Sequence, residues 1–502
     1  MPFAPCPLRF LLALLLAMEA HCRAPSSKRE TESLLLSVAS CPVPLTDDAL
    51  DALDTYDSCA LPAFVARLVR NDYADDELEM PDLSSLSRFA GLVPRSAFEA
   101  QLERFIDPEG ELRGTMAIDP ERRVLRPDPL LAPGVEIAFA EDLPGAAPPC
   151  GGPSCRGQLV PPLRPERPYR EARRRELIAH PDPMLPLLGL RIAIDPGHSG
   201  GPYGGIEERR FVARGEEAAP AVVLEEGDFT LRTALELRSK LVARGANVLL
   251  TRERASLVHG LPLHALRPYA EHLLRRLALD PRFQGLEQAL EPAERLRLRT
   301  ALALFAVKKQ SRFESLRARA RLAMAFRPDL FLSIHYNASP GPGGRAVREE
   351  VLAMVGGNFD RERLYNPYYR WRALEEAFAI DDFDASAHLG ALCVRAMSDR
   401  LGLPVEGEPR YPDHLAIRDA QGRPTGVDAW DGALLRYLDG PAILVEGPYL
   451  DAREEFAPLE AALKAPLFTA GTRTERYAAA LAACVEDFTR TWLRSERNPF
   501  GS

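Results

Sequence analysis

The chain has 502 residues, enough for two or three domains at the usual size of about 150 residues each. Hydrophobic residues make up 46% of the sequence and charged residues 27%, the composition of a globular protein that can bury a core. The formal net charge is −9, from 63 basic and 72 acidic side chains, which argues against nucleic acid as a partner.

The N-terminus has the pattern of an export signal. Arg9 precedes a short apolar run from Phe10 to Met18, which is too short to span a bilayer. We therefore expect an export signal over residues 1–22 and a location in the periplasm or cell envelope, with a buried N-terminal helix as the alternative. Lipid attachment at Cys22 is disfavoured, because Glu19-Ala-His21 is a poor lipoprotein signal. No later segment of the sequence has the length and apolarity of a membrane helix.

The eight cysteines form no C-x-x-C pair, so a zinc ribbon is not expected. Two pairs are candidate disulfides if the compartment is oxidising, namely Cys41 with Cys59 and Cys150 with Cys155. For Cys393 and Cys484, on apolar helical faces, free buried thiols fit about as well.

Residues 30–130 predict a small module, helical or α+β, whose role the sequence does not identify. The segments that indicate structure are helices at 47–54, 61–70 and 97–105 and a strand pair near 112–125. Residues 131–185 are rich in proline, which is typical of a linker or an extended arm.

Residues 186–502 predict a larger α/β domain. A strand at 188–194, a helix at 229–244 and a strand at 246–251 form a βαβ unit, for which a parallel sheet is expected. Further strands are expected at 330–334, 351–355 and 442–445, with covering helices at 385–401 and 474–493. The expected architecture is a three-layer domain with a mostly parallel sheet.

Three of these strands deliver a polar residue at the C-terminal end. His198 follows the first strand, His335 follows Leu330 to Ile334, and Glu446 follows Ala442 to Val445. The C-terminal ends of parallel strands lie at one edge of a sheet, where ligands and catalytic groups gather. The pattern therefore predicts one converging site that includes a metal.

Six blocks of the sequence, in this order, resemble the zinc-dependent N-acetylmuramoyl-L-alanine amidase family. The blocks are Asp195-Pro-Gly-His198, Glu226 to Leu231, Gly245 to Arg252, Ser315 to Arg319, Ser333 to Asn337 and Leu444 to Glu446. The resemblance covers roughly residues 188 to 495. One departure is Ser199, which stands where the family pattern has a second glycine after the histidine.

The resemblance implies one zinc ion per chain, held by His198, Glu226 and His335 with the fourth position left to water. It implies that Glu446 is the catalytic base and then the acid. Glu226 is favoured over Glu225 by its place at the helix start, and a salt-bridged carboxylate at the rim is the alternative for Glu446.

Three further residues of the matched blocks receive supporting roles. Asp195 is expected to fix the turn or to orient a ligand, Asn337 to steady the loop after His335, and Arg319 to be structural. The other seven histidines are expected to be ordinary hydrogen-bonded residues.

Two long segments interrupt the family pattern. Residues 255–314 predict a helical hairpin inserted on the active-site side. Residues 358–383 are rich in aromatic and acidic side chains, and related amidases can carry an inserted helix here that covers the metal; a solvated packing helix is the alternative. We hypothesise that one or both segments restrict access to the site.

The function that the resemblance implies is hydrolysis of the amide bond between N-acetylmuramic acid and the L-alanine of the stem peptide, with peptidoglycan as the partner. Two alternatives stay open: an inactive peptidoglycan-binding protein of the same fold, and a zinc hydrolase of another peptide or acyl amide. The sequence identifies no activating protein.

Overall fold

The structure is a computed structural model. It describes residues 86, 89–91, 93–119, 121, 124–127, 135–140, 173, 175–177, 182–207, 209–213, 222–279, 281–338, 349–359, 364, 367–378, 380–409, 411, 413–436, 438 and 440–493. The export signal, the helices expected at 47–54 and 61–70, and the four cysteines of the candidate disulfides lie outside these residues. Of the described chain, Leu261–Phe313 forms one compact unit and the rest forms a second.

The second unit is built on a seven-stranded sheet. In spatial order the strands are β10 (Leu415–Arg418), β11 (Pro424–Trp430), β9 (Leu352–Gly356), β12 (Ala442–Tyr449), β8 (Leu330–Asn337), β4 (Arg191–Pro196) and β7 (Asn247–Leu250). The neighbours are parallel except at β10–β11 and β9–β12. The predicted α/β class with a mostly parallel sheet is confirmed.

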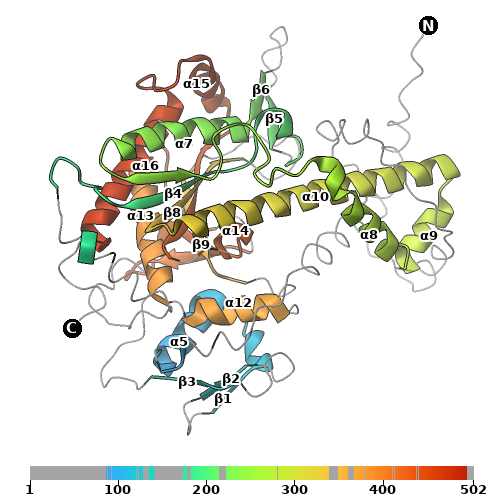
Figure 1. The fold of residues 1–502 in the computed structure, drawn as a ribbon, viewed down its shortest axis with the longest axis horizontal. Coiled ribbons are helices and arrows are strands. Elements are labelled where there is room, and N and C mark those ends of the chain that lie inside the picture. The colour runs from blue at the N-terminus through green and yellow to red at the C-terminus, as the bar shows by residue number, and fades with distance from the viewer. Residues whose placement is uncertain are drawn as a thin grey trace. The chain divides into compact units, whose positions relative to one another are not determined.

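Helices cover both faces of this sheet (Figure 1). One face packs against α7 (Glu226–Val242), α13 (Ile380–Leu401) and α16 (Arg473–Phe488). The other face packs against α14 (Ala433–Arg436) and the last turns of α10 (Pro292–Phe326). The strands read as continuous apolar runs because both of their faces are buried, as parallel strands usually are. The three-layer prediction is confirmed.

The remaining elements of this unit are shorter. They are a hairpin of β5 (Arg210–Ala213) and β6 (Val222–Glu225), the helix α15 (Arg453–Lys464), a 3-10 turn η6 (Gly201–Tyr203) and a π-helical end η8 (Thr489–Leu493). The β5–β6 hairpin was not expected from the sequence, and it leads directly into α7. Within the described residues, no helix combines the length and apolarity needed to cross a membrane.

The N-terminal module is α+β. Its elements are α5 (Arg95–Gln101), the π-helical turn η4 (Leu102–Ile106), the 3-10 turn η5 (Leu112–Thr115) and an antiparallel sheet of β1 (Ala117–Asp119), β2 (Val124–Arg126) and β3 (Ile137–Ala138). The expected helix and strand pair are both present. The third strand comes from the proline-rich segment, so part of that segment belongs to the module.

The helix α12 (Pro367–Phe378) shares a hydrophobic core with this module. The ring of Phe378 lies 5.2 Å from that of Phe89 and 4.5 Å from that of Phe98, centroid to centroid. Aromatic packing at these distances stabilises the contact beyond the burial of area. The packing interpretation of residues 358–383 is therefore favoured.

The direction of β9 gives a second reason. Leu352 pairs with Glu446 and Met354 with Leu444, so β9 runs away from Glu446 and ends near the start of β12. The segment after β9 thus leaves the sheet at the edge opposite to the polar strand ends. A covering role for this segment rests on the family resemblance alone, and the direction of β9 argues against it.

The first unit contains three helices where a two-helix hairpin was expected. They are α8 (Arg267–Leu277), α9 (Pro281–Ala289) and the first part of α10, preceded by a 3-10 turn η7 (Leu263–Leu266). Arg299 donates from Nη2 to Oε2 of the fully buried Glu287 at 2.8 Å. A role of this insertion in access to the site stays a prediction.

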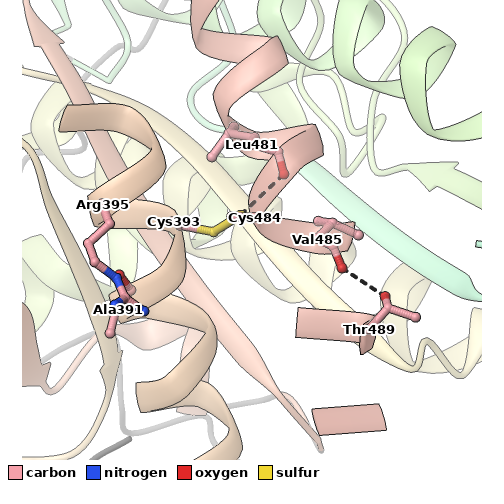
Figure 2. Close-up of a disulfide and its surroundings, with 7 residues drawn as sticks. All are labelled: Ala391, Cys393, Arg395, Leu481, Cys484, Val485 and Thr489. Carbon is pink, nitrogen blue, oxygen red and sulfur yellow. Dashed lines mark hydrogen bonds between the residues drawn. A yellow bond between two sulfur atoms is a disulfide. The ribbon is translucent and has the colours of Figure 1, made fainter. Parts of the chain in front are cut away.

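A disulfide joins the two buried helices α13 and α16. Figure 2 shows the bond between Cys393 and Cys484. Both cysteines are fully buried, and their Cα atoms lie 4.9 Å apart. The expectation of free thiols at these two positions is wrong. The packed helices bring together cysteines that are 91 residues apart, and nothing in the sequence pairs them. Disulfides form and persist mainly in oxidising compartments.

Removing this disulfide should destabilise the protein. The bond closes a long loop, so in the chain-entropy account Cys393→Ala with Cys484→Ala should cost roughly 2–4 kcal/mol of unfolding free energy. Denaturant titration of oxidised protein measures this. The same titration in reductant is the control, because reduced parent should approach the double variant; equal stability of oxidised parent and variant would contradict the prediction.

Candidate metal centre

Three residues from different elements meet at one edge of the sheet. His198 follows β4, Glu226 is the first residue of α7, and His335 lies near the end of β8. Each offers one ligand atom, and these atoms all lie within 4.8 Å of one another. Of the residues that the structure describes, no other group of histidine, cysteine and carboxylate side chains has this geometry. The three residues can hold a metal ion.

Two glycines allow this close approach. A Cβ atom on Gly197 would lie 2.5 Å from the ring of His335. A Cβ atom on Gly227 would lie 2.1 Å from the backbone nitrogen of Gly200, where the turn after β4 touches the start of α7. Any side chain at either position would push the elements that carry the three residues apart.

Glu226 is placed between the two imidazoles. Its Oε2 lies 3.4 Å from His198 Nε2, and its Oε1 lies 3.1 Å from His335 Nδ1. Oε1 also accepts a hydrogen bond from the backbone N–H of Tyr336 at 3.1 Å, whereas Oε2 is buried without a hydrogen-bond partner. A buried carboxylate oxygen that faces an imidazole nitrogen and has no donor of its own fits a bound cation.

Glu226 and His198 favour the protonation states that a metal ligand needs, whereas His335 without a metal favours its charged form. Burial alone would raise the pKa of Glu226, but His198, His335 and Arg209 outweigh it and lower the pKa to about 2. Burial lowers the pKa of His198 and so favours the neutral ring that metals bind. Burial also opposes the charged form of His335, but the hydrogen bond to Glu226 dominates and raises its pKa.

Glu446 lies beside this group because β12 and β8 pair with Glu446 opposite His335. Its Oε2 is buried without a hydrogen-bond partner, and burial raises the pKa of Glu446 to about 7. Glu446 makes no ion pair with any described residue, which disfavours the alternative of a salt-bridged carboxylate at the rim. A carboxyl group with this pKa can both accept and release a proton near neutral pH.

The structure also brings Glu207 and Arg209 to the site. Glu207 accepts a hydrogen bond from His198 Nδ1 at 2.8 Å through Oε2, and one from the Ser199 hydroxyl at 3.0 Å through Oε1. Arg209 Nε lies 3.7 Å from Glu226 Oε2. Both residues belong to a loop whose sequence shows no periodicity, so no sequence signal singled them out.

The contact to Glu207 fixes which nitrogen of His198 is free. With Nδ1 bonded to the carboxylate, Nε2 is left to face Glu226 and a metal, the arrangement that usually orients a ligand histidine. Ser199, which departs from the family pattern, contributes a hydrogen bond to the same carboxylate.

Buried arginines hold the turn that carries His198, whose φ of 55° is unusual for a residue other than glycine. Arg319 donates to the backbone oxygen of His198 at 2.7 Å and to that of Pro196 at 2.6 Å. Arg252 donates to the backbone oxygen of Gly197 at 3.0 Å. Burial, with help from the nearby Arg319, lowers the pKa of Arg252 to about 9.

Asp195 holds Arg319, which in turn binds the turn that carries His198. It pairs with Arg319 Nη1 at 2.6 Å and accepts hydrogen bonds from Thr251 and Ser333, so it fixes the turn rather than orienting either histidine through a hydrogen bond. Asn337 accepts a hydrogen bond from the backbone N–H of Ala338 at 2.8 Å, which steadies the loop as expected.

Glu225, the rival of Glu226 in the sequence, is turned away from the histidines. Its Oε1 pairs with Arg210 across the β5–β6 hairpin. The register of the hairpin thus separates two adjacent glutamates into one that meets the histidines and one that does not.

Comparison with known proteins gives structural similarities only. No protein-family profile and no curated protein sequence matches the chain. The CwlD amidase from Clostridioides difficile, solved with the GerS lipoprotein, is 15% identical; the match covers 60% of this chain and 99% of that one with a TM-score of 0.33. The catalytic domain of CwlV, an N-acetylmuramoyl-L-alanine amidase from Bacillus (Paenibacillus) polymyxa, is 16% identical; the match covers 60% of this chain and 98% of that one with a TM-score of 0.30. The amidase AmiC2 of Nostoc punctiforme is also 16% identical; the match covers 60% of this chain and 97% of that one with a TM-score of 0.31. We therefore base the functional proposal on the residues of this chain.

Proposed function

We propose that the protein is an exported zinc amidase that hydrolyses the bond between N-acetylmuramic acid and the L-alanine of the peptidoglycan stem peptide. The observation that carries the proposal is the convergence of His198, Glu226 and His335 with Glu446 at one sheet edge. The six sequence blocks that resemble the amidase family contain all four residues in order. The buried disulfide supports an oxidising location outside the cytoplasm.

The donor set fits zinc. Two imidazole nitrogens and one carboxylate oxygen are the ligands of many catalytic zinc sites, and the unpartnered Oε2 of Glu226 is available for a cation. A zinc ion held there would polarise a carbonyl group and make a water molecule more acidic. The contact from Glu207 would keep the His198 ring in the orientation that this binding needs.

Glu446 is the residue placed to move the proton. As the water oxygen bonds to the amide carbon, the carboxylate of Glu446 takes a proton from that water. When the bond from carbon to nitrogen breaks, Glu446 gives the proton to the leaving amine of the peptide, and the lactyl carboxylate remains on the sugar. The pKa of about 7 suits both steps.

A digest of purified sacculi tests this function. The expected products are glycan strands with free lactyl groups and stem peptides with a free N-terminal L-alanine, identified by mass. Intact sacculi after incubation with zinc-loaded protein that still binds them would favour the inactive binding protein. Activity on other amides alone would favour a zinc hydrolase of different specificity.

Removal of a ligand should abolish zinc binding. His335→Ala leaves two ligands, too few for tight binding of zinc by a protein site. We expect about one zinc per chain in the parent and almost none in the variant, measured by elemental analysis after dialysis against a weak chelator. The control is His264→Ala, at a histidine in the turn η7 of the first compact unit. Equal zinc content in parent and His335→Ala would refute the assignment.

Removal of Glu207 should weaken zinc binding without abolishing it. Loss of the partner of a ligand histidine typically costs 10- to 100-fold in metal affinity, and we expect Glu207→Ala to fall in this range. Competition with a chromophoric chelator measures the affinity. Glu207→Gln, which keeps an acceptor for His198 Nδ1, should lie between the parent and the alanine variant; an unchanged affinity in Glu207→Ala would contradict the role.

A further inference from the structure

Arg209 is held beside the proposed ligand carboxylate by the backbone. In the β5–β6 hairpin Arg210 pairs with Glu225, so the residue before Arg210 lies opposite the residue after Glu225. The backbone N–H of Glu226 donates to the backbone oxygen of Arg209 at 3.0 Å. Strand pairing therefore fixes the backbone of Arg209 next to that of Glu226.

The guanidinium N–H groups of Arg209 are available to donate hydrogen bonds to a ligand. Its Nε lies 3.7 Å from Glu226 Oε2, too far for a hydrogen bond, and the side chain is 42% exposed. Its positive charge interacts with the carboxylates of Glu226 and Glu446. Arg209 donates no side-chain hydrogen bond to a described residue, so its N–H groups can serve a ligand that enters beside the carboxylates.

The charges around Arg209 indicate that this ligand carries negative charge. Without a metal, Arg209 offsets the negative charge of Glu226. A divalent cation held by Glu226 would neutralise the charge of that carboxylate instead, and the guanidinium of Arg209 would then be free beside Glu446. Attack on an amide puts negative charge on the carbonyl oxygen, and a donor fixed in advance near that oxygen lowers the barrier.

We propose that Arg209 is a further catalytic residue, which donates hydrogen bonds to the carbonyl oxygen of the scissile amide as that oxygen becomes negative. This inference rests on the proposed amide hydrolysis. It requires that Arg209 contributes to the transition state more than to binding of the ground-state substrate, and that it is not needed to retain the metal.

Kinetics of zinc-loaded full-length protein test the first requirement. Arg209→Gln should lower kcat by roughly 10²- to 10³-fold, the usual effect of losing one such donor, with little change in KM. Arg209→Lys, which keeps the charge, should recover part of the loss. Arg238→Gln, at an arginine on α7 that pairs with the exposed Glu253, is the matched control. A higher KM at unchanged kcat would overturn the proposal, because Arg209 would then bind a substrate carboxylate uniformly.

Two measurements without peptidoglycan test the rest. Arg209→Gln should bind zinc at least as tightly as the parent, because the substitution removes a cation next to a ligand; weaker zinc binding would overturn the proposal. Inorganic phosphate, a tetrahedral oxyanion, should bind the zinc-loaded variant roughly 10- to 100-fold more weakly than the parent, measured by calorimetry. Equal phosphate affinity, including no binding by either protein, would also overturn it. Failure of the parent to digest sacculi would instead reject the proposed function.

Discussion

Glu446→Gln should lower kcat by roughly 10²- to 10⁴-fold while zinc content stays at the level of the parent. Glutamine keeps the size of the side chain but cannot take a proton from water or return one to the leaving amine. The parent should lose kcat/KM at acidic pH, because Glu446 must be ionised to act as a base; burial raises the pKa of Glu446, and a bound cation would lower it again. Stopped digests of sacculi over a pH series measure both effects.

Stability separates this catalytic role from a structural one. Burial raises the pKa of Glu446 above its value in the unfolded chain, so ionisation of this group costs stability as the pH rises from about 4.5 to about 7. Metal-free Glu446→Gln should therefore be at least as stable as the metal-free parent at neutral pH. Glu408→Gln, at an exposed glutamate that pairs with Arg418, is the control. Full activity in Glu446→Gln, or a large loss of stability, would contradict the assignment.

The sequence predicts most of the sheet, because its buried strands are apolar runs that end at polar residues. It does not predict the direction of β9, since a run of four apolar residues from Leu352 has the same composition in either direction. That direction decides where residues 358–383 leave the sheet. The disulfide is missed for a related reason, because helix packing alone brings Cys393 to Cys484.

The candidate site likewise contains residues that the sequence predicts and residues that it does not. His198, His335 and Glu446 could be predicted because each follows an apolar run of a strand near its C-terminal end, and position along a strand determines the sheet edge. Glu207 and Arg209 could not, because their places depend on a loop and on the register of a hairpin. Residues at strand ends can thus be predicted from the sequence. Glu207 and Arg209, which orient and neutralise the proposed ligands, can be identified only from the three-dimensional structure.

The buried pair of Arg319 and Asp195 should matter more for stability than any other contact near the site. Both side chains are 2% exposed, and Arg319 also binds the backbone oxygens of Pro196 and His198. Arg319→Met would leave the Asp195 carboxylate buried with only the hydroxyls of Thr251 and Ser333. Breaking a buried pair in this way typically costs 3–5 kcal/mol, so we expect a loss of about that size in unfolding free energy at pH 7.

The pH dependence gives this prediction its sharpest test. Burial would raise the pKa of Asp195, but Arg319 chiefly holds it below the usual range, so the parent keeps this stabilisation until the pH falls below about 4. In Arg319→Met the native pKa of Asp195 should rise instead, and the loss should be largest at neutral pH and shrink towards pH 4. Adding Asp195→Asn to Arg319→Met should restore part of the stability, because the unpaired charge is gone. Arg321→Met, at an exposed arginine on the same helix, is the matched control. A loss below about 1 kcal/mol at pH 7, the size of an exposed ion pair, would show that the turn carrying His198 is held by other contacts.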